Sequence, residues 1–223
     1  MAVFRLDEEL WLPDPYLGNP DGLVAVGGDL SAERLIHAYS NGFFPWFSYR
    51  LCPWPHWYCP LDRFVFFPDK IHVSHSMKQL IRREKYVVTF NEDFSGVIQN
   101  CSKVDGRNKE MGAWLSSDII KAYTTLHQLG YAASVEVWEG YEQGDRRLVG
   151  GLYGVTIRNA FFGESMFSLV PSASKLALIA LAQRLSEKGW HFIDCQFETP
   201  HLRSMGGEHI SYKKYMEMLE GKG

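Results

Sequence analysis

The sequence lacks several features that would assign it at once to a metal-binding, membrane or secreted class of protein. Only four of its 223 residues are cysteines, and no two have the C-x-x-C spacing of a thiolate zinc site or a dithiol redox motif. No apolar run approaches the roughly 20 residues of a membrane-spanning helix. The first residues also lack the basic and then apolar pattern of a secretory signal. We therefore expect a cytoplasmic protein with reduced thiols and no membrane partner.

An excess of one charge is missing as well. The formal net charge is −3, so bulk charge neither favours nor excludes a nucleic-acid partner. The chain has no G-x-S-x-G elbow and no Walker phosphate loop. The glycine-rich segment 150–154 lies in or beside a predicted strand hairpin, which indicates a close backbone approach rather than a dinucleotide site. His72 and His75 lack a third ligand nearby, so a metal site is not expected.

The sequence does have a change of composition near residue 60. The first part is rich in Pro, Gly and Trp. It predicts a short strand within residues 21–30 and a helix that Ser31 caps and that runs to about residue 40. The prolines of segment 43–60 exclude a helix and disfavour a central strand. Its aromatic side chains are interpreted either as packing between domains, which composition favours, or as a stacking platform for a flat ligand.

The second part alternates strands with helices. The pattern predicts a mixed domain of the α+β class with a largely antiparallel sheet, in which three consecutive strands pair. The predicted strands are 63–67, 86–90, 132–138, 147–157, 160–167 and 190–195, and the predicted helices begin near Ser74, Asp93, Ser116, Ser172 and Ser211.

Two carboxylates, Glu164 and Asp194, lie inside apolar strand-like segments. A buried carboxylate is costly unless it is paired or hydrogen-bonded, and such groups serve either as structural links or as general bases and ligand anchors. Gln196 follows Asp194 by two residues, so both side chains are expected on the same face of one strand.

Seven short motifs then occur in an order that resembles one family. Each motif is weak alone, but the ordered set resembles the bacterial leucyl/phenylalanyl-tRNA–protein transferases over about residues 12–219. The motifs are Leu23-Val-Ala-Val-Gly-Gly-Asp-Leu30, Gly42-Phe-Phe-Pro-Trp-Phe47, Ser134-Val-Glu-Val-Trp138, Leu148-Val-Gly-Gly-Leu-Tyr-Gly-Val155, Phe162-Gly-Glu-Ser-Met-Phe167, Ala173-Ser-Lys-Leu-Ala-Leu178 and Ile193-Asp-Cys-Gln196.

The resemblance implies both an activity and a fold. This family moves Leu or Phe from Leu-tRNA or Phe-tRNA to proteins that begin with Lys or Arg, which marks them for N-degron proteolysis, and it needs no metal and no ATP. Its larger domain is acetyltransferase-like (GNAT-type). We therefore expect a small N-terminal α/β domain in residues 1–62, a GNAT-like catalytic domain in residues 63–223, and a monomer.

The resemblance also implies catalytic residues. The acceptor amine must be neutral and positioned against the ester carbonyl. Gln196 is predicted to orient this amine, while Asp194 polarises Gln196 or accepts the proton. Glu164 is predicted to bind an ammonium group of either substrate. The 2′-hydroxyl of the tRNA ribose is an alternative that would leave these side chains as positioning groups.

Substrate contacts follow in the same way. An apolar donor pocket is predicted from Leu152, Phe161, Met166 and Ile193, although each has an equally plausible role in the core. By their positions, Trp57 and Trp114 are predicted to stack on the terminal adenosine. Here the family's Trp-Trp-Ser-Pro is replaced by Trp-Tyr-Cys-Pro (57–60), and its Thr-Trp-Ile by Ala-Trp-Leu (113–115).

A local basic cluster provides a candidate tRNA contact. It comprises Arg63, Lys70, Lys78, Arg82, Arg83 and Lys85. We predict that Arg82, Arg83 and Lys85 contact acceptor-stem phosphates, and the alternative is an ordinary solvated helix face.

Two other functions compete with the transferase. One is an acyl-CoA-dependent N-acyltransferase of the same fold, which would need a glycine-rich cradle at a helix N-terminus. Segment 171–175 has that position but contains no glycine. The other is a tRNA- or degron-binding module without catalysis.

Overall fold

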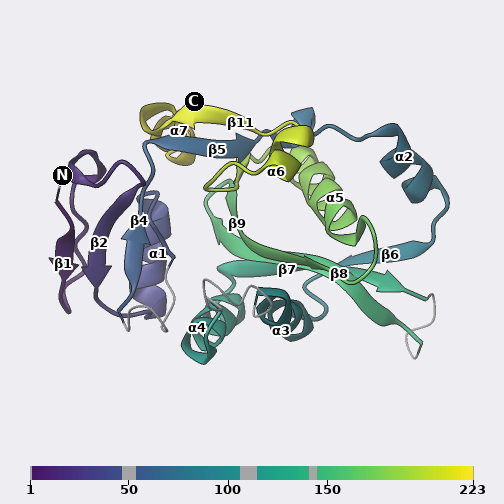
Figure 1. The fold of residues 1–223 in the computed structure, drawn as a ribbon, viewed down its shortest axis with the longest axis horizontal. Helices are drawn as coiled ribbons and strands as arrows, with labels where there is room; N and C mark the ends of the chain where they lie inside the picture. Colours follow the sequence, from purple (N-terminus) through teal and green to yellow (C-terminus); the bar gives the residue numbers. More distant parts are fainter. Residues whose placement is uncertain (1, 47–53, 106–114, 141–144, 223) are drawn as a thin grey trace.

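The computed structural model describes residues 2–46, 54–105, 115–140 and 145–222 (Figure 1). The described chain forms two sheets. The smaller sheet has the order β1-β2-β4-β3, and helix α1 packs beside it. Its elements are β1 (Phe4–Leu6), β2 (Leu23–Gly27), α1 (Ala32–Ser40), β3 (Phe44–Pro45) and β4 (His56–Tyr58), with a short 3-10 turn at Pro15–Leu17.

The larger sheet has the order β11-β5-β10-β9-β8-β7-β6. Its strands are β5 (Asp62–Phe66), β6 (Tyr86–Phe90), β7 (Ala132–Glu139), β8 (Arg147–Ile157), β9 (Ala160–Ser168), β10 (Phe192–Asp194) and β11 (Glu208–Ser211). Within the described part of this sheet, β9 and β10 form the one parallel pair. The predicted antiparallel run of three strands is confirmed as β7-β8-β9.

Helices cover both faces of the larger sheet. Figure 1 shows α5 on one face and α3 with α4 on the other. The side chains of Ser74 and Ser116 accept hydrogen bonds from the first turns of α2 and α4, which is why those helices begin there. The helices are α2 (His75–Arg82), α3 (Phe94–Asp105), α4 (Ser117–Gln128), α5 (Ala173–Glu187), α6 (Pro200–Ser204) and α7 (Tyr212–Leu219), with a 3-10 turn at Pro68–Lys70.

One hydrophobic core continues from the smaller sheet into the larger one. It includes Ala38 and Tyr39 of α1 together with Phe162 of β9. The rings of Tyr39 and Phe162 meet edge to face, with centroids 5.1 Å apart. A second core lies under α5. The two sheets therefore share buried surface, and α1 is held against β8 and, through Tyr39, against β9.

The structure differs from the sequence-based expectation in a few places. Strand β4 lies inside the smaller sheet although prolines surround it, because none of its own three residues is a proline. Strands β1 and β11 and helix α6 were not predicted, since each is five residues or fewer. The division at residues 62 and 63 stays a prediction. Among the described residues, no helix is long and apolar enough to cross a membrane.

Gly154 allows an unusually close approach between β8 and β9. A Cβ atom at this position would lie 2.1 Å from the carbonyl oxygen of Phe162 and 2.5 Å from the ring of Phe161. Its register partner Gly163 has more room, since a Cβ there would meet one atom, the carbonyl oxygen of Asp194, at 3.5 Å. A side chain is therefore excluded by steric overlap at Gly154 but not at Gly163.

We expect Gly154→Ala to lower the free energy of unfolding by about 1–3 kcal/mol, because the added methyl overpacks a filled core. Urea denaturation monitored by tryptophan fluorescence measures this change. Gly163→Ala is the matched control and should change stability by about 0.5 kcal/mol or less. Equal effects of the two substitutions would show that the approach of the strands does not depend on Gly154.

Candidate active site

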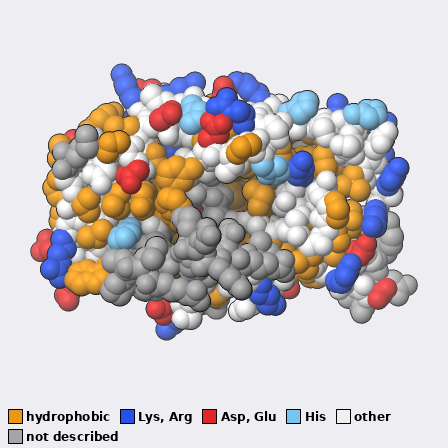
Figure 2. All heavy atoms as spheres, in the orientation of Figure 1, with side chains coloured by type: hydrophobic (Ala, Val, Ile, Leu, Met, Phe, Trp, Pro, Cys, Tyr) orange, Lys and Arg blue, Asp and Glu red, His pale blue; other side chains and the backbone are white. Residues whose placement is uncertain are grey.

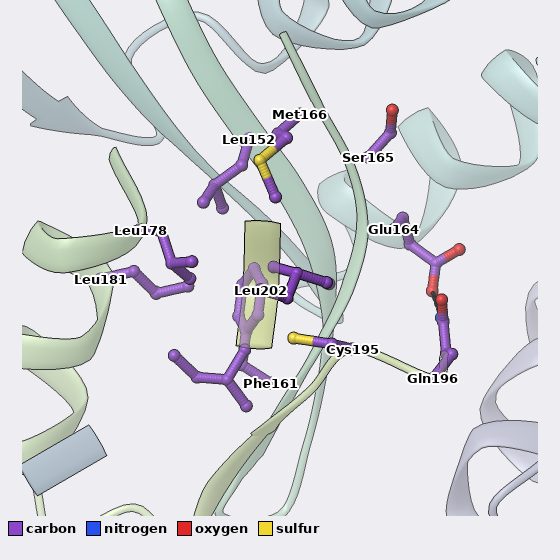
Figure 3. A pocket seen from close by; sticks show the side chains of 12 residues that line it. Leu152, Phe161, Glu164, Ser165, Met166, Leu178, Leu181, Cys195, Gln196 and Leu202 are labelled. Atoms are coloured by element: carbon purple, nitrogen blue, oxygen red, sulfur yellow. Dashed lines mark hydrogen bonds between the residues drawn. The ribbon is translucent and has the colours of Figure 1, made fainter. Parts of the chain in front are cut away.

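An apolar cavity of about 300 Å³ lies between the larger sheet and α5 (Figure 3). All four predicted donor-pocket residues line it. Met166 is partly exposed, whereas the other three are at most 4% exposed. Sequence reasoning missed further lining residues, which come from α5, α6 and the end of β10. The complete apolar and sulfur-containing lining is Leu152, Phe161, Met166, Leu178, Leu181, Ile193, Cys195 and Leu202.

A hydrogen-bonded polar group closes one end of this cavity. Gln196 Nε2 donates to Glu164 Oε1 at 3.1 Å, and Figure 3 shows the two side chains facing each other. Tyr39 donates to Glu164 Oε1 at 2.7 Å, and Tyr123 donates to Oε2 at 3.0 Å. The two tyrosine hydroxyls are themselves 2.5 Å apart. Sequence reasoning missed both tyrosines, because nothing in the chain pattern links α1 and α4 to β9.

Burial controls the ionisation of this group. It raises the pKa of Glu164 to about 7, although hydrogen bonds from Tyr39 and Tyr123 act in the opposite direction. Burial also raises the pKa of both tyrosines well above their ordinary value. The hydroxyls therefore stay protonated, and Glu164 exchanges its proton near neutral pH.

Asp194 lies in a different environment from the one predicted. Its side chain is 0% exposed and paired with Arg63, whose Nη2 lies 2.7 Å from Oδ2. Tyr215 donates to Oδ2 at 2.9 Å, and the backbone N–H of Gln196 donates to Oδ1 at 2.7 Å. The carboxylate is thus fully occupied by protein partners.

The predicted common face of Asp194 and Gln196 is wrong. Strand β10 ends at Asp194, and Gln196 has a left-handed backbone with φ of 62°. This turn sends the Gln196 side chain to Glu164, while the Asp194 side chain points to Arg63. The Asp194 carboxylate therefore contacts the backbone N–H of Gln196 and not the Gln196 side chain.

Arg63 also differs from its expected place in a basic surface cluster. It is 0% exposed, so it has no access to a phosphate. Burial lowers its pKa, but the Asp194 carboxylate outweighs this effect and raises it above the ordinary value. The rings of Phe44 and Tyr215 lie 4.9 and 4.8 Å from the guanidinium carbon. The cation is therefore paired and enclosed.

The two predicted stacking tryptophans have different outcomes. Trp57 is 0% exposed and donates its indole N–H to the carbonyl of Gly27 at 2.9 Å. Its ring is part of the core and has no open face for a base. Trp114 lies outside the described residues. By contrast, Trp46 is 38% exposed beside Gln196.

A second groove begins on the other side of Gln196. A gap of about 70 Å³ lined by Trp46, Glu164, Gln196 and Phe197 leads to a groove of about 750 Å³. Gln196 lines the cavity, the gap and the groove. The acidic residues of the groove are Asp21, Asp62 and Glu198, and its aromatic residues are Tyr16, Trp46, Tyr58 and Phe197.

The predicted tRNA contacts lie at and just beyond the end of α2. Arg82 and Arg83 are exposed, whereas Lys85 forms an ion pair with Glu139 at 3.1 Å. Figure 2 shows Lys and Arg side chains along the edge of the molecule where α2 and β6 lie. Within the described residues, no cluster of three or more His, Cys, Asp and Glu side chains suits a metal ion.

The fold and the site define an enzyme of mixed α and β structure, with an apolar cavity that ends on a carboxyl and an amide. Comparison with known proteins gives the family. The model of the leucyl/phenylalanyl-tRNA protein transferases matches residues 65–220, and the model of their N-terminal domain matches residues 28–61. The chain belongs to this family, as its motifs predicted, and is an aminoacyltransferase.

Individual relatives agree with this result. A protein of Syntrophobacter fumaroxidans is 45% identical over 219 residues, which are 98% of this chain and 90% of the relative. One of Maridesulfovibrio salexigens is 45% identical over 99% of this chain and 89% of its own length. Both are named leucyl/phenylalanyl-tRNA–protein transferase. A solved Bacteroides thetaiotaomicron protein of unknown function has a TM-score of 0.47 at 11% identity over 88% of this chain and 64% of its own, too weak a likeness to bear on function.

We expect Asp194→Asn to destabilise the fold by about 3–5 kcal/mol, because it leaves the Arg63 cation buried without its counter-charge. Chemical denaturation at constant pH measures the loss. Glu139→Gln, which breaks exposed ion pairs with Lys85 and Arg147, is the control and should have little effect. If both substitutions have the same small effect, the buried pair does not stabilise this end of β10.

Proposed function

We propose that this protein transfers Leu or Phe from aminoacyl-tRNA to the α-amino group of proteins that begin with Lys or Arg. The observation that carries the proposal is the 300 Å³ apolar cavity ending on Glu164 and Gln196. An apolar side chain without a branch at Cβ, such as Leu or Phe, suits this lining. The flexible Met166 side chain can adjust to either. The larger domain is proposed to be acetyltransferase-like, and the enzyme to act as a cytoplasmic monomer in the N-degron pathway.

The reaction joins an amine to an ester that is already activated. A free α-amino group has a pKa near 8, so about a tenth of it is neutral at pH 7. Gln196 gives its amide N–H to Glu164 and can offer its carbonyl oxygen to the amine. Asp194 acts as a positioning group, since it holds the backbone of Gln196 and its own oxygens are occupied. Transfer then depends mainly on orientation.

The second groove supports a cationic acceptor. Its three carboxylates would attract a Lys or Arg side chain, while its aromatic surfaces suit the following residues of the acceptor. Part of this charge is already engaged, because Arg203 forms an ion pair with Glu198 and His209 lies 2.9 Å from both Asp62 and Glu198. Since Gln196 borders both spaces, a donor in the cavity and an acceptor in the groove would meet beside it.

One assay separates the candidate functions. Labelled Phe-tRNA is incubated with peptides that are identical except for a first residue of Arg, Lys or Ala. We expect transfer to the Arg and Lys peptides only. Equal transfer to the Ala peptide would contradict the proposed acceptor preference. Acylation that requires an acyl-CoA would favour the N-acyltransferase, and binding without transfer would favour the binding module.

The donor pocket can be tested by filling it. Met166→Trp should lower transfer of Phe by at least about tenfold, because the indole occupies space that the donor side chain needs. Met166→Leu keeps the volume and should retain transfer within about threefold. Single-turnover rates with saturating Phe-tRNA measure both. Full activity of the Trp variant would place the donor elsewhere.

The basic end of α2 is proposed to contact tRNA phosphates. Arg82→Glu and Arg83→Glu should each weaken tRNA binding and reduce its salt dependence by about one unit of slope, because each removes one phosphate contact. Filter binding at several salt concentrations gives both quantities. Lys103→Glu changes an exposed charge on α3 and serves as the control. If the α2 variants bind tRNA as tightly as the unmodified protein, the tRNA-binding surface lies elsewhere.

A further inference from the structure

The Glu164 carboxyl and the hydroxyls of Tyr39 and Tyr123 form a closed ring of three oxygen-to-oxygen contacts. The contacts are Tyr39 to Glu164 Oε1 at 2.7 Å, Tyr123 to Glu164 Oε2 at 3.0 Å, and hydroxyl to hydroxyl at 2.5 Å. Both tyrosines are 0% exposed, so their hydroxyls are enclosed by protein. The ring joins α1, α4 and β9.

The number of protons in this ring depends on the state of Glu164. Each hydroxyl carries one proton and can donate once. If the carboxyl is ionised and both hydroxyls donate to it, the 2.5 Å contact between the hydroxyl oxygens has no proton and is repulsive. If Glu164 carries a proton on Oε2, it donates to Tyr123, Tyr123 donates to Tyr39, and Tyr39 donates to Oε1. Every contact then has one proton.

The surroundings of the ring also favour the neutral carboxyl. The nearby Asp194 carboxylate disfavours a second negative charge, and burial raises the pKa of Glu164 to about 7. No cation contacts Glu164 in the described part of the site: its partners are Tyr39, Tyr123 and the neutral amide of Gln196, and the ring of Tyr153 lies against Tyr123. A buried carboxyl without a counter-ion is expected to hold its proton.

We propose that Glu164, closed into a ring with Tyr123 and Tyr39, holds a proton in the free enzyme and donates it to the departing ribose oxygen. This donor role goes beyond the proposed function and rests on it. The amine nitrogen of the acceptor bonds to the aminoacyl carbonyl carbon, and the bond from that carbon to the ribose oxygen breaks. For this step Oε2 turns its proton from Tyr123 to the ribose oxygen, and the proton lost by the attacking nitrogen restores the carboxyl.

The position of Glu164 suits this role. It lines both the apolar cavity and the gap toward the groove, so it borders the place where ester and amine would meet. A neutral carboxyl would also have no charge with which to hold the acceptor as an unreactive ammonium ion. In this proposal Glu164 acts as a neutral acid, whereas the alternative from the sequence is that it binds an ammonium group of a substrate.

Infrared difference spectra of the free enzyme test the protonated ring directly. The spectrum of the unmodified protein minus that of Glu164→Gln should contain the carbonyl band of a protonated carboxyl at pH 6, where an ordinary Glu with a pKa of about 4.3 is ionised. The band should disappear as the pH rises past about 7. Disappearance near pH 4.3 would overturn the proposal.

Tyrosine variants test the ring itself. Tyr39→Phe removes a donor to the carboxyl C=O group and should move the band to higher wavenumber. Tyr131→Phe, which changes a partly exposed tyrosine outside the ring, should leave the band in place. A band that does not respond to Tyr39→Phe would show that Glu164 is not closed into the ring.

Steady-state kinetics then test proton donation. Glu164→Gln should lower kcat by at least about tenfold and leave the acceptor KM within about twofold, because it removes a group that acts in the transition state. A raised KM with normal kcat would instead indicate an ammonium anchor and overturn the donor role. Absence of transfer by the unmodified enzyme would refute the proposed function and the donor role together, whereas the infrared band tests the protonated ring independently.

Discussion

The ion pair between Arg63 and Asp194 determines how this end of the larger sheet is built. Both side chains are 0% exposed, and removing two charges from water is costly unless each is well paired and hydrogen-bonded. Here Tyr215 of α7 and the Phe44 ring of β3 complete the enclosure. The pair therefore joins β5, β10, the C-terminal helix and the smaller sheet. It also fixes the turn that carries Gln196, because the same carboxylate accepts the Gln196 backbone N–H.

The site depends on both sheets for a related reason. The apolar cavity belongs to the larger sheet and α5, but its polar end requires Tyr39 from α1, which packs with the smaller sheet. The gap to the groove likewise uses Trp46, which follows β3. Any movement of the smaller sheet relative to the larger one would thus change the hydrogen bonds of Glu164. The shared core makes such a movement costly, since it would expose buried aromatic surface.

The sequence predicts the regular elements well and the polar partners poorly. Periodicity and serine caps locate β6, β8 and most helices because these signals are local. The four residues predicted to form the donor pocket do line one cavity, while their role as that pocket stays a prediction. The partners of the buried carboxylates, Arg63 and Tyr39, are separated from them by more than 100 residues, and no local pattern encodes such a contact. The turn at Gln196 was missed because a glutamine gives no sign of a left-handed backbone.

That left-handed residue has a consequence for the stability of the molecule. A residue with a Cβ atom in this conformation costs roughly 1–2 kcal/mol, which glycine would avoid. The backbone alone would thus be more stable with glycine at position 196, whereas the glutamine side chain supplies the hydrogen bond to Glu164. Selection for thermal stability without selection for activity would replace Gln196 wherever this backbone gain exceeds the loss of its hydrogen bond to Glu164. Under the proposed function, a chain that gained stability by this replacement would lose activity, so this position should be held fixed in any effort to make the protein more robust.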